Sequence, residues 1–183
     1  MKKILTASAI AAAMMFSYSA SAETGTVNFI GQVIDNGCDI VVAPTHNPAT
    51  VSAAAIDLKM VDRASMGTTV GTIANKTPFS LTASNCPATV TKVSASFDYT
   101  PVVGNDAYLK NMETTDNGVG VQLFDDNNGG QGVVKGIETS PVTINVTDGS
   151  ALLPFSAALV NTVGAGVSAG LVSANAQYTI IYQ

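Results

Sequence analysis

Few residues of this chain could do chemistry, and those present favour a structural role. The 183 residues include one histidine, His46, and one arginine. A catalytic triad would need that histidine as its base, and no serine or cysteine nucleophile has a suitable set of partners. His46 lies near Pro44 and Pro48, and we expect it to be an exposed loop residue. The sequence therefore predicts neither a catalytic residue nor a cofactor, and an enzyme is the least favoured class of protein.

Two cysteines, Cys38 and Cys86, lie 48 positions apart. A redox couple usually shows the spacing C-x-x-C, which is absent here. A zinc site would need more ligands than two thiols and His46 supply. In an exported chain, an even number of cysteines indicates a structural disulfide. Closing this loop should stabilise the fold by roughly 4 kcal/mol on the chain-entropy estimate.

The acidic run at residues 125–130 reads DDNNGG and faintly resembles a calcium loop. It lacks the later glutamate and several of the ligands that a calcium loop needs. Aspartate, asparagine and glycine are also the residues preferred in tight turns. We therefore expect a hairpin turn, and no metal site.

Charge and composition exclude two broad classes. Thirteen acidic against eight basic residues give a net charge of −5. A protein that binds nucleic acid normally shows a basic surplus or stripe. Disordered chains combine low hydrophobicity with high net charge, whereas 46% of this chain is hydrophobic. A folded protein that does not bind nucleic acid is expected.

The N-terminus is typical of a secretory signal peptide. Residues 1–3 are short and basic, residues 4–16 are apolar, and residues 20–22 have the small-x-small form of a cleavage site. The apolar run is shorter than the roughly 20 residues that span a bilayer. Cleavage after Ala22 would leave 161 residues and change the net charge from −5 to −7. We expect residues 1–22 to be removed on export.

The remaining sequence reads as strands separated by turns. Alternation of apolar and polar residues, typical of half-buried strands, occurs at 26–33 and 90–99. Further strand-like segments and one helical turn are expected, the strands at 51–58, 79–82, 120–124, 142–146, 152–160 and 176–182, and the turn near 61–66. The glycine- and alanine-rich residues 164–174 read as a flexible loop. This pattern predicts an all-β fold, a β-sandwich.

Short motifs follow one another in a fixed order along the chain. They are TVNFIGQVIDNGC at 26–38, VDRASMG at 61–67, FSLTASNC at 79–86, GVQLFD at 120–125, LPF at 153–155, and a C-terminal signature of Gly170, fourteenth from the end, with the penultimate Tyr182. One such motif alone would be weak. The ordered set resembles the structural subunits of chaperone–usher fimbriae, the type 1 pilin-like family, and in particular its major subunit.

The resemblance implies an incomplete immunoglobulin-like β-sandwich that lacks its final strand. A donor strand from the neighbouring subunit would complete it. Residues 1–22 would be the signal peptide, 23–34 the N-terminal donor-strand extension and 35–183 the pilin domain. A periplasmic chaperone would fill the open groove first, and an outer-membrane usher would assemble the fibre from identical or related subunits.

The donor strand is expected to present alternate residues to a neighbour's groove. Val27, Phe29 and Val33 would point into it, and Gly31 would allow close approach of the two backbones. The residues alone also fit an ordinary edge strand of the same domain.

The C-terminal strand is expected to form part of the acceptor side. Tyr178, Ile180 and Tyr182 share one face. In the family this strand carries the chaperone-recognition signal, to which Gly170 also belongs, and core packing would be compatible with that role.

The predicted function is a structural subunit of a surface fimbria, exported through the periplasm, that supports cell adhesion. The alternative is a minor tip or adapter subunit, or an adhesin that binds a host glycan, and only then would a host receptor be a partner. A two-domain adhesin would add a lectin domain, for which 161 residues leave no room.

Overall fold

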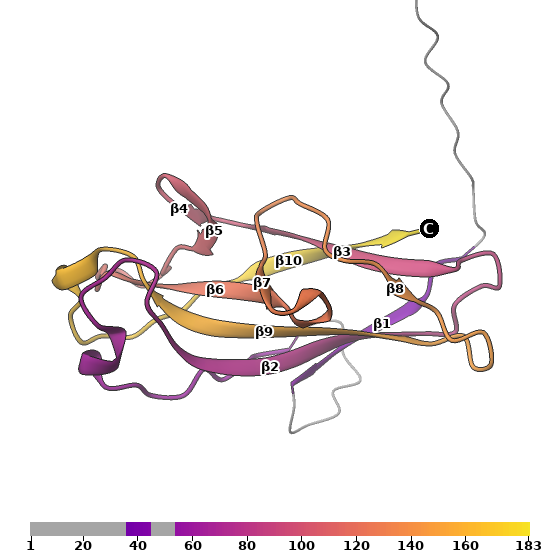
Figure 1. Ribbon diagram of the computed structural model, residues 1–183, viewed down its shortest axis with the longest axis horizontal. Helices are drawn as coiled ribbons and strands as arrows, with labels where there is room; N and C mark the ends of the chain where they lie inside the picture. The colour runs from indigo at the N-terminus through magenta and orange to yellow at the C-terminus, as the bar shows by residue number, and fades with distance from the viewer. Residues whose placement is uncertain (1–35, 45–53) are drawn as a thin grey trace, which may run out of the picture. The chain divides into compact units, whose positions relative to one another are not determined.

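Strands dominate the computed structural model, which describes residues 36–44 and 54–183 (Figure 1). The predicted strand at 26–33 and His46 lie outside the described residues. The described strands are β1 (Asp39–Pro44), β2 (Ile73–Ser84), β3 (Lys92–Tyr99), β4 (Pro101–Val102), β5 (Asn105–Leu109), β6 (Val119–Asp125), β7 (Gln131–Gly132), β8 (Val142–Thr143), β9 (Ala151–Asn161) and β10 (Ala176–Tyr182). Three short 3-10 helices accompany them, η1 (Arg63–Met66), η2 (Asp126–Asn128) and η3 (Gly164–Gly166).

The strands form two antiparallel sheets. The larger has the order β1-β2-β9-β6-β5-β4, with β7 also paired to β6, and the smaller has the order β10-β3-β8. β10 pairs with β3 over its whole length, from Ala176 opposite Tyr99 to Tyr182 opposite Val93. In the described residues, β10 has no partner on its other side.

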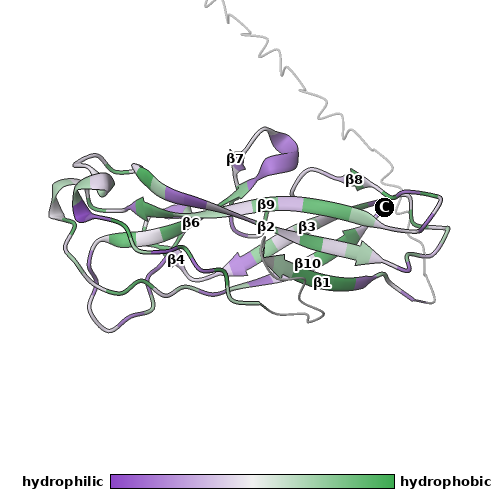
Figure 2. Cartoon of the chain, turned by 90° about the horizontal axis from the view of Figure 1, so that it is seen from below, coloured by the Kyte–Doolittle hydropathy of each residue, from purple (hydrophilic) through white to green (hydrophobic). Residues whose placement is uncertain are grey.

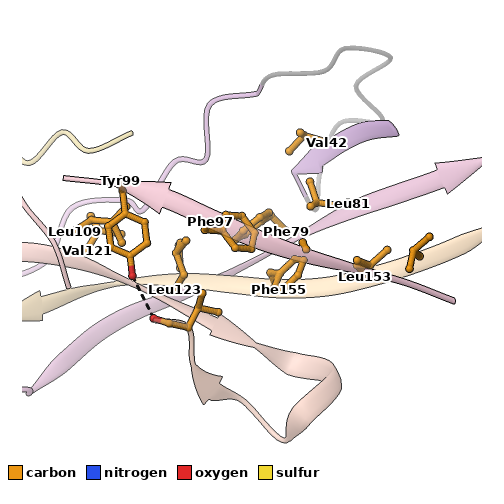
Figure 3. Packing of buried hydrophobic residues seen from close by; sticks show 14 of the residues in the cluster. Val42, Phe79, Leu81, Phe97, Tyr99, Leu109, Val121, Leu123, Leu153 and Phe155 are labelled. Atoms are coloured by element: carbon orange, nitrogen blue, oxygen red, sulfur yellow. Dashed lines mark hydrogen bonds between the residues drawn. The ribbon is translucent and has the colours of Figure 1, made fainter. Parts of the chain in front are cut away.

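The core lies between these sheets and is centred on three phenylalanines (Figure 3). Phe79 of β2 and Phe155 of β9 stack with their ring centroids 5.6 Å apart. Phe97 of β3, in the other sheet, meets Phe155 edge-on at 5.1 Å. Aromatic rings favour both arrangements. The contact across the sheets confirms the predicted all-β sandwich.

The apolar face predicted for residues 90–99 is confirmed in β3, although Ser94 on the opposite face is buried as well. Val93, Ala95, Phe97 and Tyr99 are all at most 5% exposed. The helical turn expected near 61–66 is η1, and the hairpin expected at 125–130 joins β6 to β7 through η2. Figure 2 shows this hairpin as one of the most hydrophilic parts of the described chain.

The strand prediction was wrong in two places. The described part of 51–58, residues 54–58, is not a strand, although its side chains alternate between half-buried and exposed. Strand assignment needs a hydrogen-bonded neighbour, which periodicity cannot supply. At 142–146 only Val142–Thr143 is a strand, followed by an isolated bridge between Asn145 and Ser150. The strands β1, β4, β5 and β7 were not predicted.

A disulfide joins Cys38 to Cys86, as the sequence predicts. It links the residue before β1 to the region just after β2, where Asp39 lies opposite Ser84. The bond thus fastens the first described strand to the larger sheet. None of the helices in the described part of the chain has the length and apolar character needed to span a membrane.

Candidate functional site

An apolar groove of about 1290 Å³ lies between two irregular segments of the sandwich. We call residues 54–61 the N-terminal wall and residues 167–175 the C-terminal wall. Neither wall belongs to a strand. The floor is built from core side chains of β2, β3, β6 and β9, among them Phe79, Leu81, Phe97, Val121, Leu123 and Leu159. A groove of this kind can bind an apolar segment but offers little for catalysis.

The N-terminal wall turns alternate side chains toward the core. Ala54, Ile56 and Leu58 are half-buried and pack against the core cluster. Near its end, Met60 is 98% exposed. The wall is tied to β2 by one side chain, because Asn75 Nδ2 donates a hydrogen bond to the carbonyl of Leu58 at 2.7 Å.

Asn75 lies at an irregularity of the β2–β9 pairing. The register shifts between Ala74 and Thr77, and Asn75 has a φ of 55°. Asparagine tolerates this left-handed conformation better than most residues. The bulge therefore turns the Asn75 amide away from the ladder and toward the wall.

An exposed pair, Asp57 and Lys59, lies on the same wall. Lys59 donates to Asp57 from its backbone nitrogen and from Nζ, at 2.8 Å and 2.6 Å. The side-chain hydrogen bond from Lys59 is the main reason that the pKa of Asp57 lies below its ordinary value. An exposed pair of this kind is worth little in stability.

The C-terminal wall also turns alternate side chains toward the core. Val172 and Ala174 alternate toward the core, while Leu171 is 77% exposed. Two buried asparagines hold the wall. Asn111 Nδ2 donates to the carbonyl of Leu171 at 3.0 Å, and Asn117 Nδ2 donates to the same oxygen at 3.4 Å.

Backbone groups complete this attachment. Asn111 Oδ1 accepts from the N–H of Ser173 at 3.0 Å, and the carbonyl of Ser173 accepts from the N–H of Met112 at 2.7 Å. The carbonyl of Asn117 accepts from the N–H of Ser168 at 3.0 Å. The wall is therefore anchored at three of its nine residues, without a strand ladder.

Asn161, the last residue of β9, joins the bases of both walls. It is 0% exposed. Its Nδ2 donates to the carbonyls of Met66, Gly67 and Gly164, at 3.0, 3.3 and 2.8 Å. Its Oδ1 accepts from the N–H groups of Val163 and Gly164. One side chain thus fixes the end of η1, which follows the N-terminal wall, and η3, which precedes the C-terminal wall.

Of the predicted C-terminal residues, Gly170 and Tyr178 lie in the groove, and Tyr182 lies beside Cys38 at the start of the domain. Tyr178 and Gly170 line the groove, and burial raises the pKa of Tyr178. Ile180 and Tyr182 pack against the core cluster from the same strand. Gly170 lies outside β10, within the C-terminal wall.

The side chain of Tyr182 contacts the backbone of Cys38, beside the disulfide. Its hydroxyl oxygen accepts a hydrogen bond from the N–H of Cys38 at 3.2 Å. A Cβ on Gly37 would lie only 2.5 Å from that oxygen, so a larger residue would displace the Tyr182 ring from this position. The structure therefore brings together the penultimate residue and the first cysteine, 144 positions apart.

The predicted donor residues Val27, Phe29, Gly31 and Val33 lie outside the described residues. In the part of the chain that the structure describes, no three histidine, cysteine, aspartate or glutamate side chains are grouped to hold a metal ion. The buried side-chain polar atoms of those residues all have hydrogen-bond partners. The apolar groove is therefore the candidate binding site of the described residues.

Comparison with known proteins identifies the family. A family model described as "Fimbrial protein" matches residues 27–183. The chain belongs to the fimbrial protein family. Among curated proteins, this fimbrial protein is similar to the fimbrial-like protein YdeS of Escherichia coli K12, with 27% identity and 91% of each chain covered.

Solved structures with the same fold as this fimbrial protein include subunits of chaperone–usher pili. The P pilus rod subunit PapA superposes with a TM-score of 0.60 and 21% identity, covering 78% of this chain and 99% of that one. A chain from the structure of a chaperone–usher pilus superposes with a TM-score of 0.61 and 22% identity, covering 88% of this chain and 96% of that one. At these identities the likeness establishes the fold, which confirms the immunoglobulin-like sandwich. The predicted family is confirmed by the family model.

Reasoning from the sequence did not find the asparagines of this fimbrial protein. Asn161 ends a long apolar run, and Asn117 precedes Gly118 and an apolar strand. An asparagine at the border of an apolar strand usually reads as a turn residue. The partners that give these side chains their role, Leu171 for Asn117 and Met66 for Asn161, are 54 and 95 positions away, so no local signal indicates that role.

Proposed function

We propose that this protein is a structural subunit of a surface fimbria and polymerises by donor-strand exchange. Residues 23–34 of one copy fill the groove of the next. The observation that carries the proposal is the groove itself. Two walls with alternating inward side chains flank an apolar floor, and neither wall has a strand partner.

The sandwich supports this proposal at its open edge. β10 lies at one end of the smaller sheet, with β3 on one side only among the described residues. An unpaired edge beside an apolar groove favours addition of a strand, because backbone hydrogen bonds supply affinity and alternate side chains supply register. Val27, Phe29, Gly31 and Val33 alternate as such a strand requires.

The same exposed edge explains the proposed partners. A subunit with an open groove would aggregate unless it is covered. We infer a periplasmic chaperone that covers the groove before assembly, and an outer-membrane usher that exchanges it for the next subunit. Residues 1–22 would direct export, and the finished fibre would lie on the cell surface.

Deleting residues 23–34 after the signal should abolish surface fibres while the disulfide-bonded subunit still accumulates in the periplasm. Electron microscopy of the cells and a gel of the unboiled protein measure both outcomes. Fibres of normal length and number from the deleted chain would refute the donor-strand assignment.

A single substitution gives a sharper test. Gly31→Leu places a large side chain where the donor must approach the groove closely, and should block polymerisation. Gln32→Leu adds the same side chain to the opposite face of the strand and serves as the matched control. Equal loss of fibres in both variants would contradict the proposed register.

A tip or adapter role is the second candidate. The tip adhesin CupB6 of Pseudomonas aeruginosa shares the fold with a TM-score of 0.50 and 22% identity, covering 61% of this chain but 31% of that one. Immunogold labelling separates the two roles. Labelling along the whole fibre supports the shaft subunit, and labelling at the fibre end alone supports the tip.

A further inference from the structure

The walls of the groove keep their places without the hydrogen-bond ladder that normally holds a strand. Ile56 and Val172 are half-buried and could bury more apolar surface by closing over the floor. Something must oppose that collapse if an incoming strand is to find the groove open. Three asparagine side chains bind the backbone of the walls and hold it in place.

We propose that Asn75, Asn111 and Asn117 are positioning residues that keep the groove ready to receive a donor strand. The inference rests on the proposed function and adds to it the groups that set the groove's width. Each amide binds wall backbone and links it to β2 or to the segment between β5 and β6.

An amide side chain suits this task because it both donates and accepts. Asn111 donates to the carbonyl of Leu171 and accepts from the N–H of Ser173, so it satisfies two backbone groups that a neighbouring strand would otherwise pair. Asn111 Nδ2 also donates to Asn117 Oδ1 at 3.2 Å, which links the two asparagines into one unit. That unit is buried, where each hydrogen bond is hard for water to replace.

Gly170 makes room for this unit. A Cβ on Gly170 would lie 3.1 Å from Asn117 Nδ2 and 3.3 Å from Asn117 Cβ. A larger residue would require Asn117 to move by a few tenths of an ångström. The glycine of the C-terminal signature therefore belongs to the wall attachment as well as to the lining of the groove.

Holding the walls in place should speed the uptake of a strand rather than slow its release. A groove that must first reopen is competent for only a fraction of the time, and binding weakens by that fraction. Once the strand is bound, it supports the walls itself. Loss of these asparagines should therefore lower the association rate of the strand more than it changes the dissociation rate.

The experiment uses the mature chain, kept dilute to limit association through its open groove, and a large excess of a fluorescent peptide of residues 23–34, so that the peptide outcompetes the same residues of other copies. Stopped-flow fluorescence measures both rates. Two variants test the two walls. Asn111→Asp keeps the acceptors and the size of the side chain but faces Leu171 with an oxygen. Asn75→Gly keeps the left-handed backbone and removes only the side chain. We expect each to lower the association rate about tenfold and to change the dissociation rate less than about twofold.

Two further measurements separate positioning from general stability. The amides of Ser173 and Met112 in Asn111→Asp should exchange with solvent faster in the free protein and regain protection when the peptide binds. Asn145→Ala removes an asparagine side chain away from the groove, where Asn145 Oδ1 accepts a hydrogen bond from the N–H of Thr147. It should leave the association rate unchanged.

Unchanged association rates in both variants would overturn the inference, while normal peptide uptake by the unaltered chain would leave the proposed function intact. Failure of the unaltered chain to bind the peptide would overturn both. If Asn111→Asp does not fold, Asn75→Gly decides the matter, because its loss is confined to one exposed bond.

Discussion

One hydroxyl group links the two sheets of the sandwich. Tyr99 of β3 donates from Oη to the carbonyl of Asp106 at 2.8 Å and to that of Val133 at 3.3 Å, and Figure 3 shows the second of these bonds. The side chain is buried, and burial is the main reason that the pKa of Tyr99 rises to about 12. A phenolate here would lose both hydrogen bonds and be poorly solvated.

The Tyr99 pKa predicts a loss of stability in strong alkali. The folded pKa exceeds the unfolded value of 10.0, so the contribution of Tyr99 is complete below pH 10 and declines as the pH rises from about 10 to about 12. The full loss is on the order of 2 kcal/mol. Urea unfolding measured between pH 8 and about pH 12 should show the decline.

Tyr99→Phe is the control, because lysines and other tyrosines also titrate in this range. The variant is expected to be less stable at pH 8 and to lose less stability on going to about pH 12. If both proteins lose the same free energy, the buried hydroxyl does not account for the decline.

At the scale of elements, the ends of the sandwich depend on a few side chains that replace strand pairing. Asn161 holds η1 and η3 together through five backbone groups. Neither segment contains enough regular structure to hold its own position. The hairpin between β6 and β7 is fastened in a similar way, since Asp125 accepts from the N–H groups of Asn127 and Ser140.

Asn161→Ala should lower the free energy of unfolding by about 3 kcal/mol, because it leaves several buried backbone groups without partners. Equilibrium unfolding in urea measures this loss. Asn145→Ala, at an exposed turn, should cost about 1 kcal/mol or less. A loss at Asn161 no larger than that at Asn145 would mean that the buried groups find other partners.

At the scale of the whole molecule, the described domain is closed by a covalent bond and open along a groove. The disulfide fastens β1 to β2 ahead of the N-terminal wall. Because Cys38 follows residues 23–34 in the chain, the proposed donor segment can leave the domain without breaking this bond. Polymerisation and a stable fold are thereby compatible.

Replacing both cysteines by alanine should lower the free energy of unfolding by roughly 4 kcal/mol, the value expected for closing a loop of this length. Chemical denaturation of the double variant and of the unaltered chain under oxidising conditions measures the difference. Reduction of the unaltered chain should bring its midpoint to that of the double variant, and a midpoint that does not move would contradict a structural role.

Much of the fold follows from local pattern. The alternation through Val93, Ala95, Phe97 and Tyr99 predicts a strand whose apolar face is buried, and β3 is that strand. The hairpin at 125–130 is an equally local signal, and the disulfide follows from the presence of only two cysteines. Alternation failed at 54–58 because it reports which side chains face the core, and not whether the backbone has a neighbour. β4 and β5 are short, and their pairing depends on β6.

The sequence by itself determined the class of fold, the disulfide and the family, because side-chain periodicity, cysteine number and ordered motifs are written along the chain. Only the tertiary structure decided where the groove lies and what holds it open. Asn75 and Leu58 are 17 positions apart, and Asn111 and Leu171 are 60 apart. Hydrogen bonds over such separations form only when the sheets have folded, so their physical basis is contact in space and not order in the chain.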